Sequence, residues 1–335
     1  MHQSRGGSVA ILSLAALPAV LALIAAGPVH AQGASAGWPS KTIRLVVPFT
    51  PGGAQDVLAR LLGQKVGDAL GQRLLVDNRP GAGGLIAAQE SSRANPDGYT
   101  LFLSSGAQIA IAPGLRPNLG YDPVRDFVHV IHLVDTPMLL IAHPGLPVNG
   151  VKELIAYAKA NPGKVNTAST GPGTYTHLTI ELMKSITGAP LTHVPYKGAA
   201  PALNDLIGRQ VETMCTSTAS AQPFTSTQRV KALGITAPKR SSMMPEVATF
   251  GEQGVAGLNV SSWVGISVPA KTPQAVVNRL AQLFAQALDA PDVRERMATL
   301  GAEIASISGE PFARMVREDQ ARWMKLIKAA GIKAE

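Results

Sequence analysis

Short strand-like runs alternate with segments of helical periodicity along most of the chain. A β-rich run in residues 41–49 ends in a Pro/Gly turn, and apolar residues then recur at helical spacing in residues 55–70. The alternation continues toward the C-terminus and is typical of α/β proteins, in which a mostly parallel sheet is flanked by helices. It predicts strands at residues 41–49, 73–78, 100–104, 127–142, 164–169, 191–196, 211–216 and 258–269, and helices at residues 55–70, 84–94, 151–161, 175–187, 199–208, 273–288, 292–300 and 311–330.

Two of the strand-like runs are predicted to cross between two lobes. Residues 127–142 form a long apolar run, after which a second alternating unit begins, and residues 258–269 precede helices that return to the first unit. We therefore expect lobe 1 to comprise residues 38–138 and 265–335, and lobe 2 to comprise residues 139–264. Two crossing strands would form a two-stranded hinge, so that the cleft between the lobes can open and close.

Residues 1–31 have the layout of a secretory signal peptide. Arg5 supplies a basic start, residues 9–26 are apolar, and Val29-His30-Ala31 offers a small-x-Ala cleavage site. We expect cleavage after Ala31 and export to the periplasm. The alternative is an uncleaved membrane anchor, because the apolar stretch is about as long as a bilayer-spanning helix requires.

Composition and motif spacing argue against several classes of function. The net charge is +8, but the basic residues are spread along the chain, so nucleic-acid binding is not expected. Cys215 is the single cysteine and lies in a strand-like run, where a buried hydrophobic role is favoured over a reactive thiol. The histidines lack zinc-binding spacing, and no nucleotide-binding fingerprint is present. We therefore expect neither a metal nor a cofactor.

Two glycine-rich turns join a strand to a helix, one in each predicted lobe. Amides at a helix start point outward with the positive end of the helix dipole behind them, so an anionic group is their natural partner. Each turn alone is a weak signal, whereas the pair indicates a cleft that holds a carboxylate. The first turn supplies the candidates Phe49, Pro51, Gly52, Gly53, Ala54, Gln55 and Asp56, and the second supplies Ser169, Gly171, Gly173, Thr174 and His177.

Several polar candidates have a structural interpretation beside the functional one. Ser105 ends another strand and would add a hydroxyl donor or belong to an ordinary turn. His177 lies in the first turn of a helix, where it would either contact the ligand or make a structural hydrogen bond. Asp56 is expected to fix its helix start, and Asp205 to accept a hydrogen bond from a ligand amine or hydroxyl. No Gly-x-Ser-x-Gly motif supports an acyl-transfer enzyme.

A series of short motifs runs in order through the chain from Trp38 onward. Together they resemble the extracytoplasmic receptors of tripartite tricarboxylate transporters, the TctC or Bug type. The matching segments are Trp38-Pro39, Pro48-Phe-x-Pro-Gly-Gly-x-x-Asp56, Asn78-Arg-Pro-Gly-Ala-Gly-Gly84, Tyr121-Asp-Pro-x-x-Asp-Phe127, Ser169-x-Gly-x-Gly-Thr-x-x-His177, His193-Val-Pro-Tyr-Lys-Gly198, Pro245-Glu-Val, Pro269-Ala-Lys-Thr-Pro273, Trp323 and Ala329-Ala-Gly-Ile-Lys333.

The resemblance implies a type II-like periplasmic-binding-protein fold whose two turns bind a carboxylate through backbone amides and ordered waters. It also implies that Phe49 packs on the ligand, and that Asp205 occupies the position that meets an amino group in members that bind amino acids. The implied ligands are di- and tricarboxylates, aromatic acids, amino acids and their amides. The implied partners are the membrane subunits of the transporter, and a monomer is the default for a hinged receptor.

The chain departs from the common pattern of this family after Gln210. The polar residues Thr216, Ser217 and Thr218 in this segment favour a hydroxylated or polar acid. Two alternatives to a transport receptor stay open from the sequence. One is a binding protein that docks on a membrane sensor kinase, and the other is an exported lyase or hydrolase that depends on Asp56, Asp205 or His177. In the leading interpretation no residue is catalytic.

Overall fold

The computed structural model describes residues 37–333, so the predicted signal peptide lies outside the described residues. From Pro39 onward the chain forms one compact unit. In this described part, no helix is both long and apolar enough to cross a membrane.

A mixed sheet forms the centre of this unit. The ten strands of the described chain are β1 Ile43–Val47, β2 Leu74–Asn78, β3 Thr100–Ser105, β4 Phe127–Ala142, β5 Asn166–Ser169, β6 Thr192–Pro195, β7 Thr213–Ser217, β8 Lys231–Ile235, β9 Ser261–Pro269 and β10 Glu303–Ser308. Their order is β2-β1-β3-β9-β4-β7-β5-β6, with β8 and β10 also paired to β4. Strands of the alternating units pair in parallel, β1 with β2 and β3, and β5 with β6 and β7. The pairs made by β4 and β9 are antiparallel.

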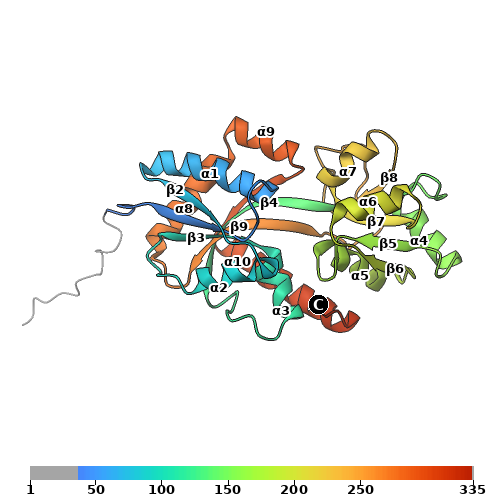
Figure 1. Cartoon of the computed structure of the whole chain (residues 1–335), viewed down its shortest axis with the longest axis horizontal. Coiled ribbons are helices and arrows are strands. Elements are labelled where there is room, and N and C mark those ends of the chain that lie inside the picture. The colour runs from blue at the N-terminus through green and yellow to red at the C-terminus, as the bar shows by residue number, and fades with distance from the viewer. Residues whose placement is uncertain (1–36, 334–335) are drawn as a thin grey trace, which may run out of the picture. The chain divides into compact units, whose positions relative to one another are not determined.

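The long strands β4 and β9 connect the two halves of the sheet (Figure 1). β4 pairs with β9 as far as Pro137 opposite Ser261, and from Met138 onward it pairs with β7 and β8. Burial on both faces of β4 explains why its sequence is an almost continuous apolar run. We call the half with β1, β2, β3 and β10 lobe 1, and the half with β5 to β8 lobe 2. The residue boundaries expected from the sequence stay predictions.

Helices flank both halves of the sheet. α1 and α8 pack on each other beside lobe 1, α5 and α6 pack on β5 and β7, and α10 packs on η2 and α3 (Figure 1). The α-helices are α1 Ala54–Leu70, α2 Leu85–Ser92, α3 Ala112–Leu115, α4 Val151–Ala160, α5 Tyr175–Thr187, α6 Ala199–Ile207, α7 Thr218–Thr225, α8 Gln274–Leu288, α9 Pro291–Thr299 and α10 Glu310–Ala330, with a 3-10 turn η1 at Ala82–Gly84 and a π-helix η2 at Ala107–Ile111.

Helix α1 shows how the sequence determines which face of a helix is buried and where the helix ends. Its apolar residues Leu58, Leu62 and Val66 recur every four positions and are buried. Gly67 allows close packing on β2, because a side chain there would meet the backbone oxygen of Gln72 at 3.0 Å. The helix ends at Gly71, which has the left-handed conformation that favours glycine.

Most of the predicted elements are confirmed to within a few residues, and α5 spans the predicted range. Four parts of the fold were not predicted: η2 with α3, α7, β8 and β10. Two of these, α3 and α7, contribute to the cavity described below.

Candidate functional site

A cavity of about 670 Å³ lies where loops from both lobes meet the crossing strands. This volume suits a small solute. Its lining comprises Ala54, Gln55, Ala82, Gly83, Leu85, Ala107, Ile111, Ala112, Leu115, Arg116, Thr136, Met138, Thr170, Pro172, Gly173, Thr174, Tyr175, Thr176, Ala199, Thr216, Ser217, Ala219, Ser220, Ser262 and Leu300.

Four of the described helices that follow a loop directly begin at this cavity. The lining includes first-turn residues of α1, α5, α6 and α7, such as Ala54, Tyr175, Ala199 and Ala219. Amides in the first turn of a helix have no partner inside the helix, and the helix dipole places positive charge there. The convergence of these helix starts gives the cavity a positive potential without many cationic side chains.

The charged side chains around the cavity also favour an anionic ligand. Arg116 is the single charged residue among the described residues of the lining, and no aspartate or glutamate belongs to it. The guanidinium of Arg116 forms no ion pair with another residue of the described chain. The cavity is therefore built to hold an anion.

Asp56 organises the first loop, residues 48–53, which precedes α1. Its buried carboxylate accepts hydrogen bonds from Gly52 N and Arg60 Nε at Oδ2 and from Asn78 Nδ2 at Oδ1, each at 2.9 Å. Asn78 Nδ2 also donates to the carbonyl oxygen of Phe49 at 3.0 Å. Mainly through the hydrogen bond from Arg60, the pKa of Asp56 falls from its usual value to about 2. The carboxylate is thus ionised and fully engaged with the protein.

The structure brings only part of the first predicted turn to the cavity. Ala54 and Gln55 line it. The other candidates of this turn are not in the lining, so their contact with a ligand stays a prediction. They are Phe49, Pro51, Gly52, Gly53 and Asp56.

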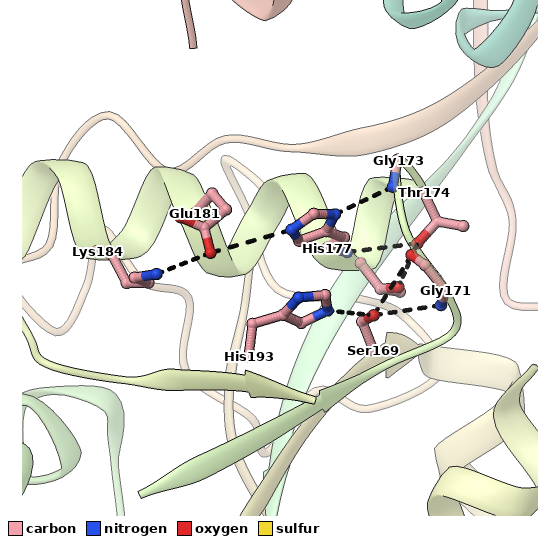
Figure 2. Close-up of polar contacts among 9 residues, drawn as sticks. Ser169, Gly171, Gly173, Thr174, His177, Glu181, Lys184 and His193 are labelled. Atoms are coloured by element: carbon pink, nitrogen blue, oxygen red, sulfur yellow. Dashed lines mark hydrogen bonds and ion pairs between the residues drawn. The ribbon is translucent and has the colours of Figure 1, made fainter. Parts of the chain in front are cut away.

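The second loop, residues 170–174, is held by a dense set of hydrogen bonds (Figure 2). Thr174 is the N-cap of α5, and its hydroxyl donates to the Gly171 carbonyl at 2.7 Å. Ser169 Oγ accepts from the Gly171 amide at 3.2 Å. Gly173 has a positive φ of 69° and lies so close to Leu115 that a side chain would meet Leu115 Cδ1 at 2.7 Å. Gly173 and Thr174 line the cavity, whereas Ser169 and Gly171 support them from outside.

His177 and His193 form a stacked pair under this loop (Figure 2), with ring centroids 3.9 Å apart. His177 Nδ1 accepts a hydrogen bond from the Gly173 amide at 3.0 Å, and His193 Nε2 lies 2.7 Å from Ser169 Oγ. Burial lowers the pKa of both imidazoles, that of His193 to about 4. The pair is therefore neutral at pH 7, the state in which Nδ1 of His177 can accept. This geometry favours the structural interpretation of His177, which is not in the cavity lining.

Replacing His177 with phenylalanine is expected to weaken ligand binding about tenfold, because the Gly173 amide loses its acceptor. Asparagine offers an acceptor near the position of Nδ1 and should keep most of the affinity. The lowered pKa of His177 means that protonation of wild-type protein occurs only below its usual range near pH 6.5, so affinity should hold at neutral pH and fall as the pH drops further. Titration calorimetry from pH 7.5 to 4.5 measures this. Equal affinities of both variants and the wild type would contradict the role of Nδ1.

A third glycine-rich loop, residues 79–84, also reaches the cavity, although its residues were not among the predicted site residues. Gly83 lines the cavity, and its carbonyl accepts from Gln108 Nε2 at 2.7 Å. Ser105 Oγ donates to Gln108 Oε1 at 2.6 Å. Ser105 is therefore buried behind the site and supports this loop through Gln108. The sequence feature that could have identified this loop is its position between a strand and a helix, which the other two loops share.

Tyr175, the first residue of α5 in lobe 2, inserts its side chain into lobe 1. Its ring contacts Trp323 of α10 edge to face, with centroids 5.9 Å apart. Gly106 lies so close that a side chain there would overlap the Tyr175 hydroxyl and meet Trp263 Nε1 at 2.6 Å. Because Tyr175 directly follows Thr174, this insertion fixes the second loop against lobe 1.

Hydroxyl groups from the crossing strands and the start of α7 line the far wall of the cavity. Thr216 and Ser217 belong to the lining, whereas Thr218 does not, and their effect on selectivity stays a prediction. Thr218 is buried, and its hydroxyl donates to the Gly301 carbonyl at 3.4 Å. Asp205 also lies outside the lining, where it accepts a hydrogen bond from the Tyr196 hydroxyl at 2.7 Å.

Metal-binding clusters and a reactive thiol do not appear among residues 37–333. No group of three or more potential metal ligands is found in this range. Cys215 is buried, as predicted, and burial raises the pKa of its thiol to about 12.

Two lobes joined by crossing strands, with an anion-receptive cavity between them, define a solute-binding protein. Residues 58–332 match the family described as the tripartite tricarboxylate transporter family receptor. The chain belongs to this family.

Solved structures of similar proteins agree with this assignment. The periplasmic binding protein BugD is 37% identical, with a TM-score of 0.70, and the match covers 89% of this chain and 100% of that one. The R. palustris protein Rpa4515, solved with adipate, is 35% identical, with a TM-score of 0.74 and coverage of 88% and 99%. MatC from Rhodopseudomonas palustris, solved with bound malate, is 34% identical, with a TM-score of 0.69 and coverage of 87% and 100%. The fold class predicted from the sequence is confirmed.

Proposed function

We propose that this chain is a periplasmic receptor that captures a small organic acid and delivers it to the membrane subunits of a tripartite tricarboxylate transporter. The observation that carries the proposal is the convergence of four helix starts on a cavity whose described lining has one arginine and no acidic side chain. The carboxylate would bind to the amides at the starts of α1 and α5, one from each lobe.

The family supports both the ligand class and the transport role. Adipate and malate, found with two of the similar proteins, are small dicarboxylates. The ligand of this chain would come from the same broad class of di- or tricarboxylates, aromatic acids, amino acids or their amides. A monomer exported by a signal peptide that is cut after Ala31 suits this role.

The positions of the three residues named for an enzymatic alternative favour binding over catalysis. Asp56 is engaged by three donors, Asp205 accepts from Tyr196, and His177 accepts from Gly173. None of the three lines the cavity. We therefore propose that the solute is bound and released unchanged.

A thermal-shift screen of the refolded mature protein tests the binding role. A carboxylate at one hundred times its Kd should add about 2.7 kcal/mol to the free energy of unfolding, and the matching neutral amide should add far less. If neutral or cationic solutes stabilise the protein and no acid does, the carboxylate assignment is wrong. Uptake of the labelled acid by cells with and without the receptor tests transport, because unchanged uptake would exclude that role.

A further inference from the structure

Two hydroxyl side chains stand side by side on the strands that cross between the lobes. Thr136 of β4 lies directly opposite Ser262 of β9, and both line the cavity. Residues opposite each other in an antiparallel pair place their side chains on the same face, within reach of one small group. Neither hydroxyl forms a hydrogen bond with another residue of the described chain, whereas Ser217 and Ser220, which also line the cavity, bond to each other.

Thr216 of β7 does not extend this pair, although it belongs to the lining. It lies opposite Leu139, three positions along β4 from Thr136, so its side chain is on the other face of the sheet. Thr216 is 1% exposed, and its buried Oγ1, which has no hydrogen-bond partner among the described residues, is closed off from the cavity. The hydroxyls that a solute can reach on this wall are therefore those of Thr136 and Ser262.

The backbone around Thr136 and Ser262 favours a neutral polar group over a second charge. Both residues lie inside the paired stretch of β4 and β9 and not at the start of a helix. Their positions are therefore unlike the helix starts, where free amides receive an anion. Desolvating a second carboxylate against hydroxyls alone costs more than desolvating an alcohol. An alcohol can donate to one of the two hydroxyls and accept from the other.

We propose that the wall formed by Thr136 and Ser262 makes the receptor selective for hydroxylated acids. This inference rests on the proposed carboxylate-binding function, because the carboxylate must bind at the helix starts for the alcohol to reach the wall. The solute class is then a small carboxylate that carries at least one alcohol group. Thr136 and Ser262 are its specificity-determining residues.

Calorimetric titration with acids that differ by one hydroxyl tests the proposal. Suitable pairs are succinate with malate, glutarate with 2-hydroxyglutarate, and butyrate with 3-hydroxybutyrate. In at least one pair the wild type should bind the hydroxylated acid about five- to tenfold more tightly, as one hydrogen bond of ordinary strength predicts. In the double variant Thr136→Val/Ser262→Ala that ratio should fall to about one.

Two control variants separate recognition from general damage. Ser261→Ala removes the neighbouring hydroxyl on β9, which does not line the cavity, and should keep the ratio. Thr136→Ser keeps the hydroxyl and should keep the affinity ratio as well. The proposed selectivity is wrong if acids bind but no hydroxylated acid binds more tightly than its partner, or if the double variant keeps the affinity ratio. In either case the receptor function stands. If no acid binds the wild type, the proposed function fails, and the selectivity with it.

Discussion

Replacing Gly106 with alanine is expected to weaken ligand binding about 100-fold. Gly106 has φ −58° and ψ −22°, a conformation that alanine adopts without strain. The new methyl group would occupy the space of the Tyr175 hydroxyl and prevent the insertion of Tyr175 into lobe 1. The second loop would then lose its position against lobe 1. Overpacking typically costs about 1 to 3 kcal/mol, and the upper end of this range corresponds to a loss of affinity of about 100-fold. Titration calorimetry of the acid found in the thermal-shift screen measures the loss.

A double-mutant cycle with Tyr175→Ala distinguishes this cause from simple destabilisation. Tyr175→Ala removes the overlapping group, so adding Gly106→Ala to it should weaken binding much less than adding it to the wild type. Purely additive effects on the binding free energy would contradict the insertion of Tyr175. The new methyl group would also contact Trp263 of β9, which could destabilise the protein by itself. Comparing the melting temperatures of the variants separates this loss of stability from the loss of affinity.

Replacing Asp56 with alanine is expected to lower the free energy of unfolding by about 3 kcal/mol and affinity by more than tenfold. The change leaves Gly52, Asn78 and Arg60 without their shared acceptor. Because the pKa of Asp56 is lowered to about 2, its stabilising contribution is fully present above the pKa of an unperturbed aspartate, 3.8, and is lost as the pH falls toward 2. Urea unfolding of both proteins at pH 7 and near pH 2.5 measures the difference.

The variant Asp68→Ala is a matched control for this experiment. Asp68 is an exposed aspartate on the same helix, and its side chain forms no ion pair with another described residue. Its replacement should leave stability and affinity almost unchanged. If the difference between Asp56→Ala and the wild type were as large near pH 2.5 as at pH 7, the charged carboxylate would not be the stabilising group.

The sequence predicted the main fold because each principal element carries a clear hydrophobic period. Helix α5 begins after an N-cap threonine and ends at Gly188, and both signals are local. The elements that were missed lack such signals. Helix α7 contains Pro223 and several hydroxyl residues, and the short strand β10 has no buried residue, so neither shows an apolar period.

The candidate site was predictable only where it follows from strand-to-helix turns. Ala54, Gln55, Gly173 and Thr174 line the cavity at two such turns. The contributions of Thr136 and Ser262 arise from the pairing of strands more than 120 positions apart, as their residue numbers show. The insertion of Tyr175 beside Gly106 likewise depends on tertiary packing. No local sequence pattern identifies a residue whose role depends on a contact with a residue far away in the sequence.

The most direct test of the central claim is a crystal structure with the bound acid identified by the thermal-shift screen. We predict that one carboxylate lies between the starts of α1 and α5, within hydrogen-bond distance of amides from both helices, inside the cavity that Gln55 and Thr174 line. An acid bound outside this cavity, or one whose carboxylate turns away from both helix starts, would contradict the account.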